Sequence, residues 1–366
     1  MKSHITAIGT AVPPYQITQS QVADFMSNAL EIDPEESRRL RALYRATGIH
    51  TRHTVLSDYT HTSGDFEFYG NNPGMEPFPS IDQRMELYRK NATPLCIQAI
   101  ENCFEQMPGF AKERVTHLIT VSCTGMYAPG VDIEIVEQVG LPTNVQRTAI
   151  NFMGCYAAFP ALKAADHICR ANPNAVVLIV CVELCSIHFQ KHNTDDHLLA
   201  NALFADGAAA VLVQSTPTPG SLYIESFHGD LISVGKKDMA WHISNFGFEM
   251  TLSAYVPDLI EQGIQVLTEN LFRNLTVSLE DISLFAIHPG GKRILEVIEK
   301  QLALSPEDNY HAYEILRNYG NMSSPTVLFV LQSIQKTLET SDKGKRILSF
   351  AFGPGLTLES MLLQVN

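Results

Sequence analysis

The chain has 366 residues, of which 45% are hydrophobic and 18% are charged. This is the composition of an ordinary soluble globular protein, long enough for two domains or one large duplicated domain. The formal net charge is −13 and the basic residues are dispersed, which argues against a surface for nucleic acid or for an anionic membrane.

The N-terminus shows no secretory pattern, and no apolar run approaches the length that spans a bilayer. The seven cysteines lie mostly in apolar segments, which is typical of reduced thiols in the cytosol. They are Cys96, Cys103, Cys123, Cys155, Cys169, Cys181 and Cys185. We therefore expect a cytoplasmic protein without membrane insertion and without a nucleic-acid partner. No metal is expected either, because Cys181, Cys185 and His188 have no second ligand pair at a suitable spacing.

The N-terminal part of the chain predicts a strand over residues 5–9 and a helix capped by Thr18 or Ser20. A second helix, over residues 35–46, carries basic side chains. Residues 57–80 are rich in Gly, Pro, Asn and aromatic residues and predict a surface excursion. A long helix from residue 80 toward 104 follows, with a possible break at Pro94.

Strands and helices then alternate, which indicates parallel strand pairing with helices covering the sheet. Strands are predicted over residues 117–122, 145–151, 176–183 and 208–213, and helices over 131–139 and 156–170. The C-terminal part repeats this order. It predicts strands over 221–227, 284–287, 346–352 and 357–363, and helices over 253–271, 292–302, 312–319 and 326–337. We predict an α/β fold of two similar halves, residues 1–219 with the reactive cysteine and residues 220–366 with its partners.

Cys155 lies where a predicted strand turns into an Ala-rich helix. Unpaired N–H groups and the positive end of the helix dipole favour a thiolate at such a place. Gly154 allows the tight turn. Most cysteines are simply small buried apolar residues, so a role for Cys155 as an acyl-carrying nucleophile requires a base elsewhere in the chain.

Two candidate partners lie in the second half. His288 ends an apolar strand and precedes Pro-Gly-Gly, and Asn321 stands just before a predicted helix. Taken singly, a strand-end His is more often structural and an Asn before a helix is more often a cap. The combination with Cys155 favours a catalytic set of Cys155, His288 and Asn321.

With these motifs the sequence resembles the type III polyketide synthases, the chalcone synthase-like group of the thiolase superfamily, and among them the bacterial synthases of alkylpyrones and alkylresorcinols. The resemblance is carried, in family order, by residues 154–155, 202–209, 288–291, 319–324 and 352–357. It implies the five-layered α-β-α-β-α thiolase fold, a homodimer, and an acyltransferase that uses coenzyme A thioesters without a cofactor.

The resemblance also implies the catalytic roles. Cys155 would take the starter acyl group from coenzyme A, and His288 would keep its sulfur ionised. His288 and Asn321 would then hydrogen-bond the thioester carbonyl of malonyl-CoA, whose decarboxylation leaves an enolate that extends the chain. The product would be a pyrone or a resorcinol or phloroglucinol ring.

The resemblance places a substrate pocket around residues that differ from the plant enzymes. Phe204 matches one gate residue of the plant pocket, whereas Met250 replaces the other and is flexible enough to admit a fatty acyl chain. The remaining pocket positions are Cys123, Trp241, Cys185, His188, Ser323, Gly353, Pro354 and Gly355. Coenzyme A would meet Arg39, Lys292 and Arg293, whereas Ala42 and Ala46 replace two of the family's basic residues. For Met250, Trp241 and Cys123 plain core packing is the alternative.

Two other functions share the order Cys, His, Asn. A ketoacyl synthase that initiates fatty acid synthesis would depend on acyl carrier protein, and residues 288–291 and 353–355 argue against it. A papain-like hydrolase would require a secretory signal and a Trp beside the Cys, and both are absent from the sequence. A thiolase-fold scaffold without activity is disfavoured because all three catalytic residues are present.

Overall fold

The structure is a computed structural model that describes residues 2–61, 64–273 and 275–366. Its thirteen named strands are β1 (His4–Ala11), β2 (Tyr15–Thr18), β3 (Thr51–Thr54), β4 (His117–Ser122), β5 (Gln146–Asn151), β6 (Val176–Leu184), β7 (Asp206–Gln214), β8 (Leu222–Leu231), β9 (Met239–Ser244), β10 (Gly247–Leu252), β11 (Ile282–Ile287), β12 (Arg346–Gly353) and β13 (Thr357–Val365). The α-helices are α1 (Gln19–Ala29), α2 (Pro34–Ala46), α3 (Ile81–Glu105), α4 (Val131–Val139), α5 (Ala158–Ala171), α6 (Asp195–Leu203), α7 (Val256–Phe272), α8 (Lys292–Leu302), α9 (Tyr310–Tyr319) and α10 (Thr326–Thr337).

The two halves of the chain have the same strand order. In the first half the order is β1-β7-β6-β4, and in the second it is β8-β13-β12-β11, each with two antiparallel pairs followed by a parallel one. A short pairing of β1 with β8 joins them into one mixed sheet of nine strands, with β5 at one edge. The predicted α/β class and the duplication are therefore confirmed.

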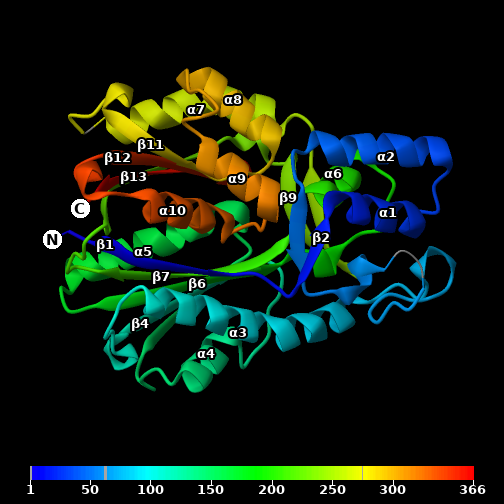
Figure 1. Ribbon diagram of the computed structural model, residues 1–366, viewed down its shortest axis with the longest axis horizontal. Coiled ribbons are helices and arrows are strands. Elements are labelled where there is room, and N and C mark those ends of the chain that lie inside the picture. Colours follow the sequence, from blue (N-terminus) through cyan, green and yellow to red (C-terminus); the bar gives the residue numbers. More distant parts are fainter. Residues whose placement is uncertain (1, 62–63, 274) are drawn as a thin grey trace.

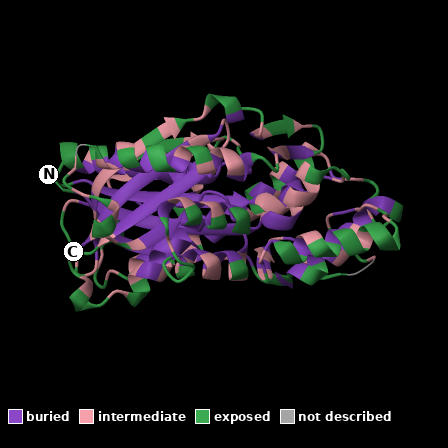
Figure 2. Ribbon diagram, turned by 90° about the horizontal axis from the view of Figure 1, so that it is seen from above, coloured by how far each residue is buried: buried purple, intermediate pink, exposed green. Residues whose placement is uncertain are grey.

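The elements form five layers (Figure 1). Helices α7 and α8 cover the strands of the second half, α5 and α10 lie between the two groups of strands, and α3 and α4 cover the outer face of the first half. Strands β6 and β7 are buried along their whole length, and the exposed residues lie mainly on the outer helices and loops (Figure 2). This is the predicted thiolase arrangement, and it buries one end of both central helices deep in the molecule.

Most sequence-based element boundaries lie within a few residues of the observed ones. Helix α3 continues through Pro94, where the sequence predicts a possible break, because buried residues on both sides of Pro94 pack into the core. Helix α5 begins at Ala158 rather than residue 156, after a 3₁₀ turn over Gly154–Tyr156. The sequence analysis missed the hairpin of β9 and β10, which carries Trp241 and Met250.

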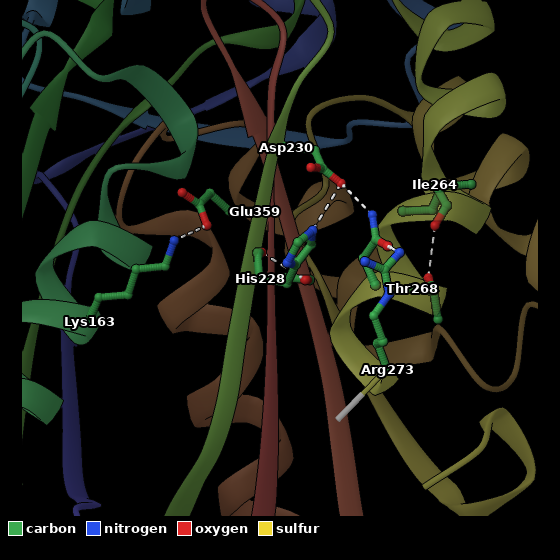
Figure 3. Close-up of polar contacts among 9 residues, drawn as sticks. Lys163, His228, Asp230, Ile264, Thr268, Arg273 and Glu359 are labelled. Atoms are coloured by element: carbon green, nitrogen blue, oxygen red, sulfur yellow. Dashed lines mark hydrogen bonds and ion pairs between the residues drawn. The ribbon is translucent and has the colours of Figure 1, made fainter. Parts of the chain in front are cut away.

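A nearly buried ion pair joins the central helix α5 to the C-terminal strand β13. The Nζ of Lys163 donates to Oε2 of Glu359, and the two side chains point toward each other (Figure 3). Only 9% of the Glu359 side chain is exposed, against 27% of Lys163. Burial raises the pKa of Glu359, and Lys163 opposes that shift by stabilising the carboxylate.

Removing one partner should therefore be costly. We expect Lys163→Met to lower the free energy of unfolding by about 1–3 kcal/mol, because a buried carboxylate loses its charged donor. The double variant with Glu359→Gln should recover part of the loss. Arg39→Met is the control, since its exposed pair with Glu35 contributes about 0–1 kcal/mol. Urea unfolding measures all three, and equal losses for Lys163→Met and Arg39→Met would contradict the expectation.

Candidate active site

One cavity of about 410 Å³ brings together Cys155, His288 and Asn321. Cys155 comes from the turn before α5, His288 from the end of β11, and Asn321 from the segment that leads into α10. Because α5 and α10 occupy equivalent places in the two halves, the cysteine and the asparagine approach the same point from two copies of one structural unit. This confirms no role by itself, but it places all three predicted catalytic residues in one cavity.

The turn that carries Cys155 is fixed by close backbone packing. Gly154 has a φ of +81°, and a Cβ at this position would lie 2.2 Å from Cδ of Pro354. A Cβ at Gly353 would lie 2.5 Å from the ring of Tyr156. The loop of residues 353–355 therefore packs directly against the cysteine turn, and its Pro354 lines the cavity.

The amide of Asn321 has a defined orientation. Its Oδ1 accepts from the backbone N of Ser323 at 2.8 Å, and its Nδ2 donates to the carbonyl of Gly290 at 3.2 Å. Nδ2 also lies 4.0 Å from Sγ of Cys155. One N–H of Asn321 is thus held by Gly290, and the second is directed toward the cysteine.

His288 is held by its backbone, while its ring is available to a substrate. Its N–H donates to the carbonyl of Phe350 at 2.8 Å, in line with the parallel pairing of β11 and β12. Neither ring nitrogen has a hydrogen-bond partner among the residues that the structure describes. Burial lowers the pKa of His288 to about 3, so the imidazole taken alone is neutral and can donate one N–H or accept one proton.

Burial also controls the charge of the cysteine. It raises the pKa of Cys155 to about 11, and the buried carboxyl of Glu183 adds to the rise. Hydrogen bonds from Ser323 and Asn321 oppose it. Burial therefore opposes the thiolate that a helix start favours, because a closed site removes the hydration of a charged sulfur. A charged sulfur requires a proton acceptor beside it.

Phe204 and Met250 lie between this cavity and a smaller neighbouring pocket of about 50 Å³, since both residues line both spaces. Trp241, Cys185 and His188 line only the smaller pocket. The wall of the main cavity is largely apolar and comes from α2, α6, β10, α7 and α8. Its apolar residues include Leu43, Leu199, Leu203, Leu252, Val256 and Ile294, which the sequence analysis did not single out.

Hydrogen bonds fix the buried His188 and the half-buried Trp241 in place. The ring of His188 accepts from the N–H of Phe248 at 3.0 Å and donates to the carbonyl of Thr124 at 2.6 Å. Trp241 Nε1 donates to the carbonyl of Cys123 at 2.8 Å. These bonds attach the β9–β10 hairpin to the end of β4, so the position of Met250 in the cavity wall depends on them.

The other predicted pocket residues support the cysteine turn. Sγ of Cys123 accepts from the N–H of Gly154 at 2.9 Å, and Cys123 lies outside the lining of the main cavity. Ser323 is buried at a φ of +58° and holds the amide of Asn321. Gly355 has a φ of +81°, which favours glycine. A missed neighbour is Glu183, which accepts from the backbone N of Cys123 and from Ser324 Oγ, and whose pKa burial raises to about 7.

Two of the three predicted cations reach the cavity. Lys292 and Arg293 line it at the start of α8, as do Ala46 and Thr47 at the end of α2. Arg39 instead pairs with Glu35 on an exposed face of α2. Within the described residues no group of three or more His, Cys, Asp or Glu is placed to hold a metal ion. No helix in the same part of the chain has the length and apolarity to cross a membrane.

In this duplicated thiolase fold a buried cysteine and an oriented amide come from equivalent segments, and an imidazole joins them in one cavity, a combination typical of a condensing enzyme of the thiolase class. Comparison with known protein families identifies the family within this class. The model of the N-terminal domain of chalcone and stilbene synthases matches residues 1–217, and that of the C-terminal domain matches residues 224–366. The chain therefore belongs to the chalcone and stilbene synthase family and is a type III polyketide synthase.

Similar proteins include the "Alpha-pyrone synthesis polyketide synthase-like Pks18" of Mycobacterium tuberculosis, which is 32% identical over 99% of this chain and 91% of the relative. The "Probable polyketide synthase 1" of Dictyostelium discoideum is 30% identical over 99% of this chain, which covers 11% of that protein. The C-terminal type III polyketide synthase domain of Steely1 from Dictyostelium has a TM-score of 0.89, with 28% identity and coverage of 100% and 99%. PKS-I of the brown alga Ectocarpus siliculosus has a TM-score of 0.91, with 28% identity and coverage of 100% and 98%. The ketoacyl synthase and the hydrolase are not favoured by these matches.

The low dielectric of the site predicts that the reactivity of Cys155 depends on His288. Burial disfavours each charge alone, so within the shared cavity we expect the two charges to arise together, by proton transfer from sulfur to imidazole, because opposite charges attract each other there. We expect iodoacetamide to alkylate Cys155 in the wild type at neutral pH. In His288→Gln the rate should rise only in the alkaline range, toward the pKa of about 11 that burial gives the isolated thiol. Mass spectrometry of the modified peptide measures the rate, and identical pH profiles for the two proteins would contradict the pairing.

Proposed function

We propose that the enzyme loads a fatty acyl group from its coenzyme A ester onto Cys155 and extends it with malonyl-CoA. The observation that carries the proposal is the single apolar cavity that contains Cys155, His288 and Asn321. Each methylene that leaves water for such a cavity contributes about 0.8 kcal/mol, which favours a long aliphatic starter over a short one.

The loading step uses Cys155 and His288. The sulfur gives its proton to the imidazole and attacks the thioester carbonyl of the starter. A carbon–sulfur bond to Cys155 forms, the bond to coenzyme A breaks, and the imidazolium returns the proton to the departing thiolate. Lys292 and Arg293 at the cavity wall supply positive charge for the phosphates of coenzyme A.

The extension step uses His288 and Asn321 as donors. Malonyl-CoA loses CO₂, and the electron pair of the broken carbon–carbon bond forms an enolate whose oxygen accepts N–H groups from both side chains. The enolate carbon attacks the acyl group on Cys155, so a new carbon–carbon bond forms and the sulfur leaves as thiolate. An amide suits this role because it donates without giving up its proton.

Cyclisation of the extended chain to a pyrone or a resorcinol completes the proposed reaction, without a cofactor.

We also propose that the enzyme acts in the cytoplasm as a homodimer, in which each chain consists of two halves that meet between residues 219 and 220. The free thiols of all seven cysteines support the cytoplasmic location. The edge strand β5 is largely exposed and leaves one side of its backbone available to a second copy.

The direct test is incubation with malonyl-CoA and a series of starters from acetyl-CoA to palmitoyl-CoA, with coumaroyl-CoA as an aromatic comparison. We expect long acyl starters to give CO₂ release and pyrone or resorcinol products, identified by mass spectrometry. Cys155→Ala should carry no acyl adduct. Turnover with coumaroyl-CoA alone would overturn the fatty acyl proposal, and strict dependence on acyl carrier protein would favour the ketoacyl synthase.

Because Phe204 and Met250 lie between the cavity and the smaller pocket, we expect the side chain at position 250 to limit the length of the starter that fits. We expect Met250→Trp to shorten the preferred starter, because the larger ring fills space on the cavity side. Excluding two methylenes lowers kcat/KM for long starters about 10-fold, while acetyl-CoA is still used. Met85→Trp, at a half-buried methionine of α3 that packs against hydrophobic residues of the first half and does not line the cavity, is the control. An unchanged length profile in Met250→Trp would show that the chain does not pass this position.

A further inference from the structure

The last turn of α6 ends beside the catalytic cavity, and each of its free carbonyls is bound by a group from elsewhere in the chain. The Nη1 of Arg52 donates to the carbonyl of Asn201 at 2.9 Å and also to that of Phe204. Gln19 Nε2 donates to Ala202 O at 2.7 Å, and the backbone N of Asn321 donates to Leu203 O at 3.0 Å. The end of α6 is therefore capped by a buried guanidinium and by the backbone of a catalytic residue.

The charge of Arg52 is suited to this position. The carbonyl end of a helix is the negative end of its dipole, so a cation there is stabilising. Arg52 is 4% exposed and lies on β3. The groups that face it are the rings of Tyr44 and Tyr59 and the buried carboxyl of Asp206, which accepts from Ser186 and from the backbone of Val55.

Arg52 also contacts the segment that carries Asn321. A Cβ at Gly320 would lie 3.0 Å from Cδ and Cγ of Arg52, and Gly320 has a φ of +69°. Next to it, the backbones of Phe204 and Asn321 form a parallel bridge, in which Ala205 N donates to Asn321 O at 2.8 Å. One side chain thus touches both the helix end that carries Phe204 and the loop that presents Asn321.

We propose that Arg52 is a positioning residue, which holds the end of α6 against the segment 320–321 and thereby fixes both the Asn321 amide at Cys155 and Phe204 in the cavity wall. This rests on the function proposed above. Arg52 lies outside the lining of the main cavity, although it lines the smaller pocket beside it, so on this proposal it acts on the main cavity through the backbone of these two residues. It links decarboxylation, which uses Asn321, to starter selection, which uses Phe204.

The test separates the two half-reactions. Arg52→Met keeps the aliphatic stem and removes the donors. We expect it to lower kcat for CO₂ release from malonyl-CoA about 10- to 100-fold, because small displacements of a catalytic group have effects of this size. Acyl loading of Cys155 with the short starter hexanoyl-CoA, followed by mass spectrometry, should change less than about 3-fold, since loading itself uses Cys155 and His288. The ratio of loading with palmitoyl-CoA to loading with hexanoyl-CoA should change, because Phe204 lines the cavity. Arg52→Lys should restore part of the CO₂ release.

Arg84→Met is the matched control. Arg84 is equally buried and also donates to backbone carbonyls, but those of Pro79 and Ile187, and within the described residues it has no hydrogen bond to α6 or to residues 320–321. We expect Arg84→Met to lose stability while keeping the wild-type ratio of decarboxylation to loading, measured per folded protein.

The outcomes are distinct. The same ratio in Arg52→Met as in Arg84→Met would overturn the proposal and leave Arg52 a structural residue. If Arg52→Met does not fold, Arg52→Gln, which also removes the charge and the guanidinium, gives the same comparison, and a wild-type ratio in that variant would overturn the proposal. A wild type that releases no CO₂ from malonyl-CoA would overturn the proposed function itself.

Discussion

Two equivalent helices buried between two groups of strands are the constraint on which the rest of the structure depends. Helices α5 and α10 lie in the central layer, so the segments that precede them meet inside the molecule. Cys155 belongs to one of these segments and Asn321 to the other. The duplicated strand order brings two distant parts of the sequence to one point, and β11 adds His288 from the side.

The same burial determines the chemistry. A closed apolar cavity raises the pKa of the thiol and lowers that of the imidazole, so neither group is charged at rest when each is considered alone. Little water remains in such a cavity to screen two opposite charges that form together, so they attract each other strongly. Hydrogen-bond donors that are already oriented also stabilise a charge that develops there. The fixed amide of Asn321 fits such a site, because its bonds to Ser323 and Gly290 hold it in place before any substrate enters.

The cavity wall and the three candidate catalytic residues come from different parts of the molecule. Cys155, His288 and Asn321 lie at the ends of core elements, whereas much of the apolar wall comes from α2, α6, α7, α8 and the β9–β10 hairpin. Met250 and Trp241 stand opposite each other in that hairpin. One lines the cavity and the other anchors the hairpin to Cys123, so changes there can alter the pocket without disturbing Cys155, His288 or Asn321.

The sequence by itself determined the α/β class, the duplication, the family and the catalytic candidates. These depend on local signals: a cysteine at a strand-to-helix turn, a histidine at a strand end before Pro-Gly-Gly, and an asparagine before a helix. Only the tertiary structure decided which apolar side chains form the cavity, that Cys123 supports the turn rather than lining it, and that Arg39 points to solvent. It also revealed Glu183 and the cap that Arg52 makes on α6. Burial, charge and contact between residues more than a hundred positions apart depend on how the layers pack, and no local pattern encodes that packing.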